Sequence, residues 1–248
     1  MKDAVRLALA RVIGGLLRAQ SRPYPFPSGT ALIVAPHADD ESLGCGGLLA
    51  AKAQRGDPVH VVFVTDSAAA PATTGVAARL GVAARRRGEA LAALREFGVP
   101  AECAHFLDAP DGRLDRLGAD GAAALHRRLS ALLGQLEPDE IFLPYLGGGS
   151  TEHDAASWLV RAAIAAGGRS PAIWEYPVWA WWNPLRLRWQ LSHARENCRL
   201  ELGALRAVKR AGLARHASQT QPAAAPLLPT VLAEACTGPV EFYFHRPG

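Results

Sequence analysis

The segment from Ala31 to Gly47, ALIVAPHADDESLGCGG, places three adjacent carboxylates beside a histidine at the end of an apolar run. Asp39, Asp40 and Glu41 repel one another, and a bound cation is the simplest compensation for such a cluster. His37 adds an imidazole nitrogen three residues before Asp40. The segment therefore offers nitrogen and oxygen donors to one ion.

Strand-like apolar runs alternate with helical segments along the chain, which predicts the elements that must position these donors. Strands are expected at 30–36, 58–66, 101–112, 139–145, 172–179 and 240–246, the last as an edge strand. Helices are expected at 43–56, 84–97, 120–135, 154–166 and 195–216, with 67–83 as a loop. Repeated β-α units at this spacing predict a single Rossmann-like α/β domain with a mainly parallel, doubly wound sheet.

Ligands of open α/β sheets bind at the carboxyl ends of the strands, where His37 and Asp40 follow the run 30–36. His153 follows the expected strand 139–145, so we expect it to lie near the first motif. Two imidazoles and one carboxylate suit zinc and leave a position for water. Asp39 would then take a proton from that water as a general base.

Two other interpretations of these residues remain open from spacing alone. A histidine at a strand end is often a hydrogen-bonded structural residue, and adjacent aspartates often cap helices. The run from Gly44 to Gly47 is similar to part of a dinucleotide-binding fingerprint, which would make the protein a nucleotide binder. The neighbouring carboxylates argue against a pyrophosphate at that place.

Several motifs, taken together, resemble one known family. PHADDE followed by GCGG resembles the PHPDDE signature of the LmbE/PIG-L family of zinc-dependent N-deacetylases. Arg86 and Glu89 resemble its RxxE helix, and LDAPDG resembles its LxxPDG turn. The segment 209–219, KRAGLARHASQ, resembles its late KxxxLxxHxSQ motif. The motifs occur in the expected order over roughly residues 30 to 220.

The resemblance implies a Rossmann-like hydrolase that uses one zinc ion per chain to remove an N-acyl group, probably N-acetyl, from an amino sugar or its conjugate. It implies a role for each matching residue: metal ligands at His37, Asp40 and His153, the general base at Asp39, and residues near the sugar at Arg86, Asp111 and His216.

One position departs from the family pattern. The family's HxDH reads Ser150-Thr151-Glu152-His153 here, so a serine replaces the histidine that stabilises the oxyanion or protonates the amine. A hydroxyl donates a hydrogen bond but supplies no proton near neutral pH. Turnover would then be slow, or another residue (His193, His216 or Tyr145) would take the role, or the protein would bind metal or glycan without turnover. Glu152 is expected to orient His153.

Composition limits the partners and the compartment. The chain has 248 residues, a net charge of +4 and four scattered cysteines without metal-binding spacing. We expect reduced thiols in a cytoplasmic protein. The densest basic run, Arg85 to Arg87, lacks interleaved aromatic residues, so no nucleic-acid partner is expected.

The ends of the chain and one aromatic segment complete the predictions. Residues 1–28 are expected to form an amphipathic helix and a proline-rich connector, and 29–248 the deacetylase domain. The helix is too charged and too short to insert stably into a membrane, so we expect it to pack on the domain. Contact of its arginines with a membrane surface is the alternative. Trp181, Trp182 and Trp189 are candidates for stacking on a sugar or for an interface, and a homo-oligomer remains open.

Overall fold

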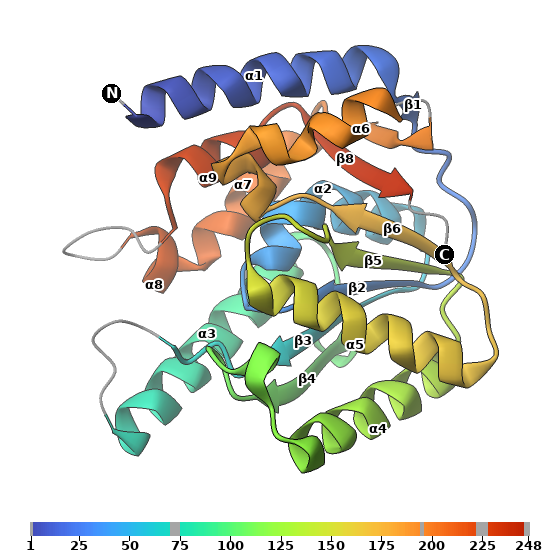
Figure 1. Cartoon of the computed structure of the whole chain (residues 1–248), viewed down its shortest axis with the longest axis vertical. Coiled ribbons are helices and arrows are strands. Elements are labelled where there is room, and N and C mark those ends of the chain that lie inside the picture. Colours follow the sequence, from blue (N-terminus) through green and yellow to red (C-terminus); the bar gives the residue numbers. More distant parts are fainter. Residues whose placement is uncertain (1, 70–74, 194–195, 222–227, 246–248) are drawn as a thin grey trace.

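The computed structural model describes residues 2–69, 75–193, 196–221 and 228–245. These residues contain an eight-stranded mixed sheet with the order β1-β7-β8-β6-β5-β2-β3-β4 (Figure 1). β8 is antiparallel to both of its neighbours, and the other pairs are parallel. The strands are β1 (Arg22–Pro23), β2 (Ala31–Ala35), β3 (Val59–Thr65), β4 (Ala104–Ala109), β5 (Glu140–Pro144), β6 (Ala172–Tyr176), β7 (Cys198–Glu201) and β8 (Val240–His245).

Helices cover both faces of the sheet. The α-helices are α1 (Lys2–Gln20), α2 (Asp40–Arg55), α3 (Val76–Glu96), α4 (Ala119–Leu136), α5 (Thr151–Gly167), α6 (Arg188–Ser192), α7 (Leu205–Arg215), α8 (Ala217–Thr220) and α9 (Thr230–Cys236). Short 3-10 turns are η1 (Ala101–Cys103), η2 (Leu114–Arg116), η3 (Trp179–Trp182) and η4 (Pro184–Leu187). No helix of the described residues is long and apolar enough to cross a membrane.

Two apolar cores lie on the two faces of the sheet. Ile33 and Phe63 point into the larger core, which α1, α2, α3 and α7 also line. Leu32 and Val62 point to the opposite face, into the core formed with α4 and α5. Both faces of the central strands are buried, which explains why these strands are apolar without alternation. The predicted single α/β domain with a mainly parallel, doubly wound sheet is confirmed.

The glycine run of the first motif lies inside α2, where it allows close packing. A Cβ on Gly44 would lie 2.1 Å from the Tyr176 ring, and one on Gly47 would lie 2.2 Å from Leu202. These glycines let β6 and the segment after β7 approach the helix. They do not form a phosphate-binding loop, so this part of the nucleotide-binding interpretation is wrong.

The carboxyl-terminal part differs most from the prediction. A long helix over 195–216 is wrong, because 198–201 is the strand β7 and α7 begins only at Leu205. The pairing of β7 with β8 overrides the helical pattern of that stretch. β8 is not an edge strand, because it lies between β6 and β7. α3 begins at Val76, within the expected loop.

Candidate metal centre and active site

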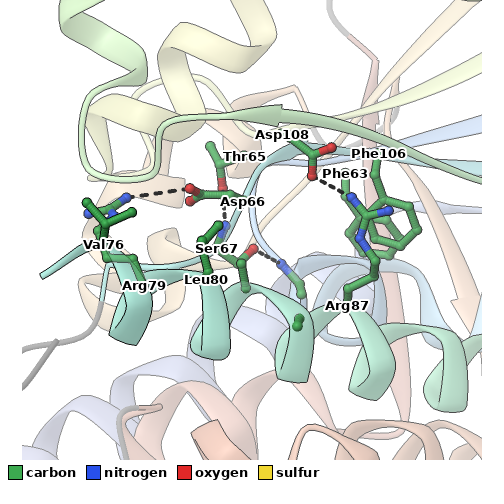
Figure 2. Close-up of a pocket in the computed structure, with 13 residues that line it drawn as sticks. Phe63, Thr65, Asp66, Ser67, Val76, Arg79, Leu80, Arg87, Phe106 and Asp108 are labelled. Atoms are coloured by element: carbon green, nitrogen blue, oxygen red, sulfur yellow. Dashed lines mark hydrogen bonds and ion pairs between the residues drawn. The ribbon is translucent and has the colours of Figure 1, made fainter.

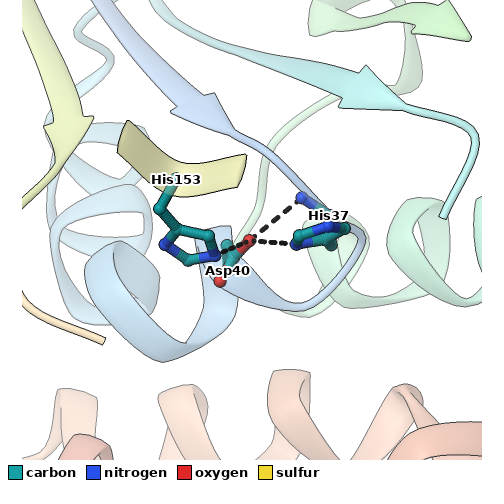
Figure 3. A group of neighbouring side chains, drawn as sticks. All are labelled: His37, Asp40 and His153. Atoms are coloured by element: carbon teal, nitrogen blue, oxygen red, sulfur yellow. Dashed lines mark hydrogen bonds and ion pairs between the residues drawn. The ribbon is translucent and has the colours of Figure 1, made fainter. Parts of the chain in front are cut away.

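His37, Asp40 and His153 converge at the carboxyl edge of the sheet (Figure 3). His37 and Asp40 follow β2, and His153 lies in the first turn of α5, which follows the neighbouring strand β5. Asp40 Oδ2 lies 3.2 Å from His37 Nδ1 and 3.2 Å from His153 Nε2. One donor atom from each residue falls within 4.8 Å of the others. The parallel pairing of β2 with β5 therefore produces this group of donors.

The three side chains fit a divalent metal ion by their chemistry and their burial. His153 Nε2 is buried and makes no hydrogen bond, although it lies close to Asp40. Burial alone would raise the pKa of Asp40, but His153 and His37 hold it well below the ordinary value. Asp40 is therefore a carboxylate beside two imidazoles, a donor set that suits zinc and similar ions.

A second group of acids surrounds the other nitrogen of the His37 ring. His37 Nε2 lies 3.1 Å from Glu152 Oε2 and 3.2 Å from Asp111 Oδ1. Burial opposes the charged form of His37, but Asp111, Asp40 and Glu152 together raise its pKa well above the ordinary value. The expectation that Glu152 orients His153 is wrong, because its carboxylate contacts His37.

Glu152 and Asp111 are also held by backbone amides. Glu152 accepts hydrogen bonds from the amides of Gly112 and Leu114, and Asp111 accepts one from Ala69 at 2.7 Å. His37, Asp111 and Glu152 also satisfy the distance requirement for a metal. Because their carboxylates already have backbone donors, we assign them to orienting His37 and assign the metal to the set with the unpartnered His153 nitrogen.

Asp39 lies beside the metal donors in a strained backbone conformation. Its φ of +139° is outside the usual range of non-glycine residues, and its amide donates to Glu41 Oε2 at 3.0 Å. Burial and the Asp40 charge raise the pKa of Asp39 to about 8. A bound cation would lower this pKa again, which suits a group that accepts and releases a proton near neutral pH.

Side chains of the late motif, residues 209–219, form hydrogen bonds with the first motif. Lys209 donates to the Leu43 carbonyl at 2.8 Å, and Gln219 donates to the Ala38 carbonyl. His216 is fully buried, with its Nε2 2.8 Å from Glu41 Oε1. His216 therefore contacts Glu41 in the interior of the protein and does not line the cavity described next.

A cavity of about 290 Å³ opens over the donors. Arg86 lines it with a buried guanidinium that donates to the Ser67 carbonyl, and its Nε is buried without a partner. Asp111 also lines it, so two of the three residues predicted to lie near the sugar face this space. Trp179 is a cavity residue that the sequence analysis missed. Its position just after β6 is the one sequence feature that could have singled out Trp179, because the neighbouring tryptophans belong to the same aromatic segment.

Other predicted candidates lie elsewhere. Ser150 caps α5, and its hydroxyl accepts a long hydrogen bond of 3.4 Å from the His153 amide. Trp181 is buried, Arg6 lies over the ring of Trp182, and Trp189 stacks on His193. Neither Tyr145 nor His193 lines the cavity over the donors.

A larger cavity of about 550 Å³ adjoins the site between α3 and the ends of β3 and β4 (Figure 2). Ala38, which lies between His37 and Asp39 in the chain, forms part of its wall. Arg87 pairs with Asp108 at 2.6 Å and lies over the Phe106 ring. The cavity therefore combines an aromatic wall with charged groups at its border.

The fold and the site define an α/β protein with two imidazoles and one carboxylate that could hold a metal ion at the carboxyl edge of a mainly parallel sheet. The sequence model of the PIG-L family, described as GlcNAc-PI de-N-acetylase, matches residues 32–164, more than half of the chain. The chain belongs to the PIG-L family, as its motifs predict.

A curated relative is a deacetylase of an amino sugar. The 2'-N-acetylparomamine deacetylase of Streptomyces fradiae is 29% identical over 160 residues, 59% of this chain and 56% of the relative. The chain thus spans little more than half the length of that relative.

Solved structures support the fold. The A40926 pseudoaglycone deacetylase has a TM-score of 0.61 at 20% identity, covering 87% of this chain and 96% of its own. The 4-carboxy-2-hydroxymuconate hydratase of Pseudomonas putida has the same TM-score at 21% identity, covering 77% and 79%. Because a hydratase shares this fold, the fold alone does not define the reaction.

Proposed function

We propose that this protein is a metal-dependent amide hydrolase that removes an N-acyl group, with N-acetyl as the proposed group, from an amino sugar or its conjugate. The observation that carries the proposal is the convergence of His37, Asp40 and His153 below a cavity that Asp39 also lines. Membership of the PIG-L family and the deacetylase activity in the relatives' names support this reaction class. We propose one zinc ion per chain, held by these three side chains.

The residues have distinct tasks in this reaction. Zinc, when bound, supplies Lewis acidity toward the amide carbonyl and toward water. Asp39 accepts the proton of the water whose oxygen attacks the acyl carbon. Asp111 and Glu152 fix the ring of His37. The carbon–nitrogen bond then breaks, the nitrogen takes up the proton that Asp39 accepted, and a carboxylate and a free amine leave.

The cavity supports an amino sugar as the substrate class. Asp111 lines the cavity and its carboxylate can accept hydrogen bonds from sugar hydroxyls, and the Trp179 indole can pack on a sugar ring. The adjoining larger cavity would take the remainder of a conjugate. We propose that the protein acts in the cytoplasm.

Ser150 favours a second candidate, a metal- or glycan-binding protein with weak or no turnover. Among the described residues that line the cavity, His37 is the one imidazole, and it is assigned to the metal. An imidazolium that could protonate the amine is therefore missing from that lining. We propose slow turnover as the consequence.

The test is an Asp39→Asn variant, assayed for acetate release from N-acetylated amino sugars at matched metal content. Removal of a general base typically costs ~10²–10⁴-fold in rate, so the variant should keep its metal and lose most turnover. Asp57→Asn, beyond the other end of α2, is the matched control. An Asp39→Asn variant as active as the wild type would remove Asp39 from the mechanism. A wild type without turnover would favour the second candidate.

A further inference from the structure

The outer face of α1 carries an exposed apolar stripe. Val5, Val12 and Leu16 are 63%, 60% and 45% exposed and occupy positions i, i+7 and i+11 of the helix. Residues at these spacings share one face. Ile13 and Leu17 lie about 100° further around the helix and are buried against the core. α1 therefore has two apolar faces, and the described residues cover just one of them (Figure 1).

Exposed apolar residues also occur on the elements beside α1. η4 and α6 pack against α1. Leu185 of η4 is 53% exposed, and Trp189 of α6 is 45% exposed. Of the eight large apolar side chains that are exposed among the described residues, five belong to α1, η4 and α6. Such a concentration marks an interaction surface rather than scattered surface residues.

The net positive charge of the chain is concentrated in the segments that contain α1, η4 and α6. Residues 2–23 contain five basic residues and one acidic residue, and 183–192 contain two arginines and no acid. Since the whole chain carries +4, the remainder of the chain is net negative. Arg22 and Arg188 are exposed and form no ion pair with any described residue.

We propose that this α1 surface docks the protein onto an anionic lipid membrane. An amphipathic helix with basic flanks lies in the membrane plane, with its apolar stripe at the boundary between headgroups and acyl chains. The arginines add attraction to acidic headgroups. A second copy of the chain fits less well, because it would bring two strongly basic surfaces together. The proposal does not depend on the proposed hydrolase reaction.

The docking surface lies near the candidate active site. Val5 of the stripe lines a cavity of about 400 Å³ that also reaches Gly148, Gly149 and Trp179. Trp179 lines the metal cavity as well. Trp179 thus borders both the cavity beside the docking surface and the cavity over the metal donors.

The test measures binding of the full chain to sedimented vesicles of phosphatidylglycerol mixed with phosphatidylcholine, and of phosphatidylcholine alone. The wild type should bind the mixed vesicles, and high salt should weaken this binding. Val12→Asp with Leu16→Asp should lower the lipid affinity by at least about tenfold, because two buried apolar contacts are lost. The matched control is Val76→Asp with Leu80→Asp, an exposed pair of the same residue types and spacing on α3. It should bind as the wild type does.

A second variant tests the charge on its own. Arg22→Gln with Arg188→Gln leaves the stripe intact and should reduce both the affinity for mixed vesicles and its salt dependence. Three results would overturn the proposal. They are a wild type that ignores anionic vesicles, equal loss of binding in both aspartate pairs, or a wild-type dimer in lipid-free solution that Val12→Asp with Leu16→Asp converts to a monomer.

Discussion

Ser150 is the residue at which this chain departs most from its family. Its hydroxyl accepts a hydrogen bond from the amide of His153, so the serine caps the helix that presents a candidate metal ligand. Side-chain caps of this kind typically contribute about 1 kcal/mol to stability. The position therefore supports the geometry of the site, while the proton-donating capacity of an imidazole is absent from it.

A Ser150→His variant should release acetate faster than the wild type. Losing one oxyanion donor typically costs ~10²–10³-fold in rate, and the variant should recover part of this factor. Its melting temperature should fall by a few degrees because the helix cap is weakened. Ser150→Ala is the control, since it loses the cap without gaining an imidazole. If both variants contain metal and are equally slow, the missing histidine does not limit the rate.

The sequence predicted that the side chains of His37, Asp40 and His153 would converge. It did not predict which residues orient the ring of His37. His37, Asp40 and His153 could be brought together from the order of strands, because parallel strands end at one edge of a sheet. The contact of Glu152 with His37 could not, because it depends on the amides of Gly112 and Leu114 in a distant turn. Trp179 shares its composition signal with three neighbouring tryptophans, and only packing separates them.

At the scale of elements, the glycines of α2 control how closely the helix packs. Gly44 lies against the Tyr176 ring, whose hydroxyl is fixed by a 2.6 Å hydrogen bond to the Val34 carbonyl. The ring cannot move without losing this bond. A methyl group at Gly44 would therefore displace α2, and with it the loop that carries His37 and Asp40.

The free energy of unfolding of a Gly44→Ala variant should be lower than that of the wild type by about 1–3 kcal/mol, the usual cost of overpacking a core. Gly88→Ala on α3 is the matched control, because no atom lies within 4 Å of the added Cβ. Alanine is the better helix former, so this control should gain about 1 kcal/mol. Urea unfolding of both variants measures the two effects, and a Gly44→Ala variant of wild-type stability would contradict the packing argument.

Elements with strong local signals were predicted well. The strands β2, β3 and β5 lie where their apolar runs indicated, because each is buried on both faces. β7 was missed because its residues, CRLE, resemble a helix surface in isolation. Its pairing with β8, about forty residues further along the chain, and with β1 makes it a strand. Such tertiary pairing leaves no local signal.

At the scale of the whole molecule, the pair formed by His60 and His105 makes the free energy of unfolding depend on pH. His105 Nε2 lies 3.2 Å from His60 Nδ1 on the neighbouring strand β3. Burial lowers the pKa of both rings, and His60 lowers that of His105 further. Below the ordinary histidine pKa, the unfolded chain therefore binds protons that the folded protein does not. This pair favours unfolding as the pH falls.

Replacing both histidines by asparagine should remove that pH dependence. The unfolding free energy of the variant should rise relative to the wild type as the pH falls through about 6.5. The change should stay below about 1 kcal/mol, because both rings are partly exposed. His126→Asn on α4 is the control. A difference between wild type and double variant that is the same at every pH would contradict the lowered pKa values.

The single-domain α/β architecture followed from the sequence because strands and helices alternate throughout its central part. The packing of α1 on the domain also followed from its amphipathic pattern. Which of its apolar faces is buried did not follow, because periodicity alone does not show this. The structure shows that Ile13 and Leu17 face the core and that Val12 and Leu16 face outward.

The most direct test of the account is the metal content of the purified chain by elemental analysis. We expect one zinc-class ion per chain in the wild type. Alanine at His37, Asp40 or His153 should abolish or greatly weaken metal binding. Asp111→Asn should retain the ion, because Asp111 orients His37 and does not itself hold the metal. Stoichiometric metal in all three alanine variants would contradict the assigned site.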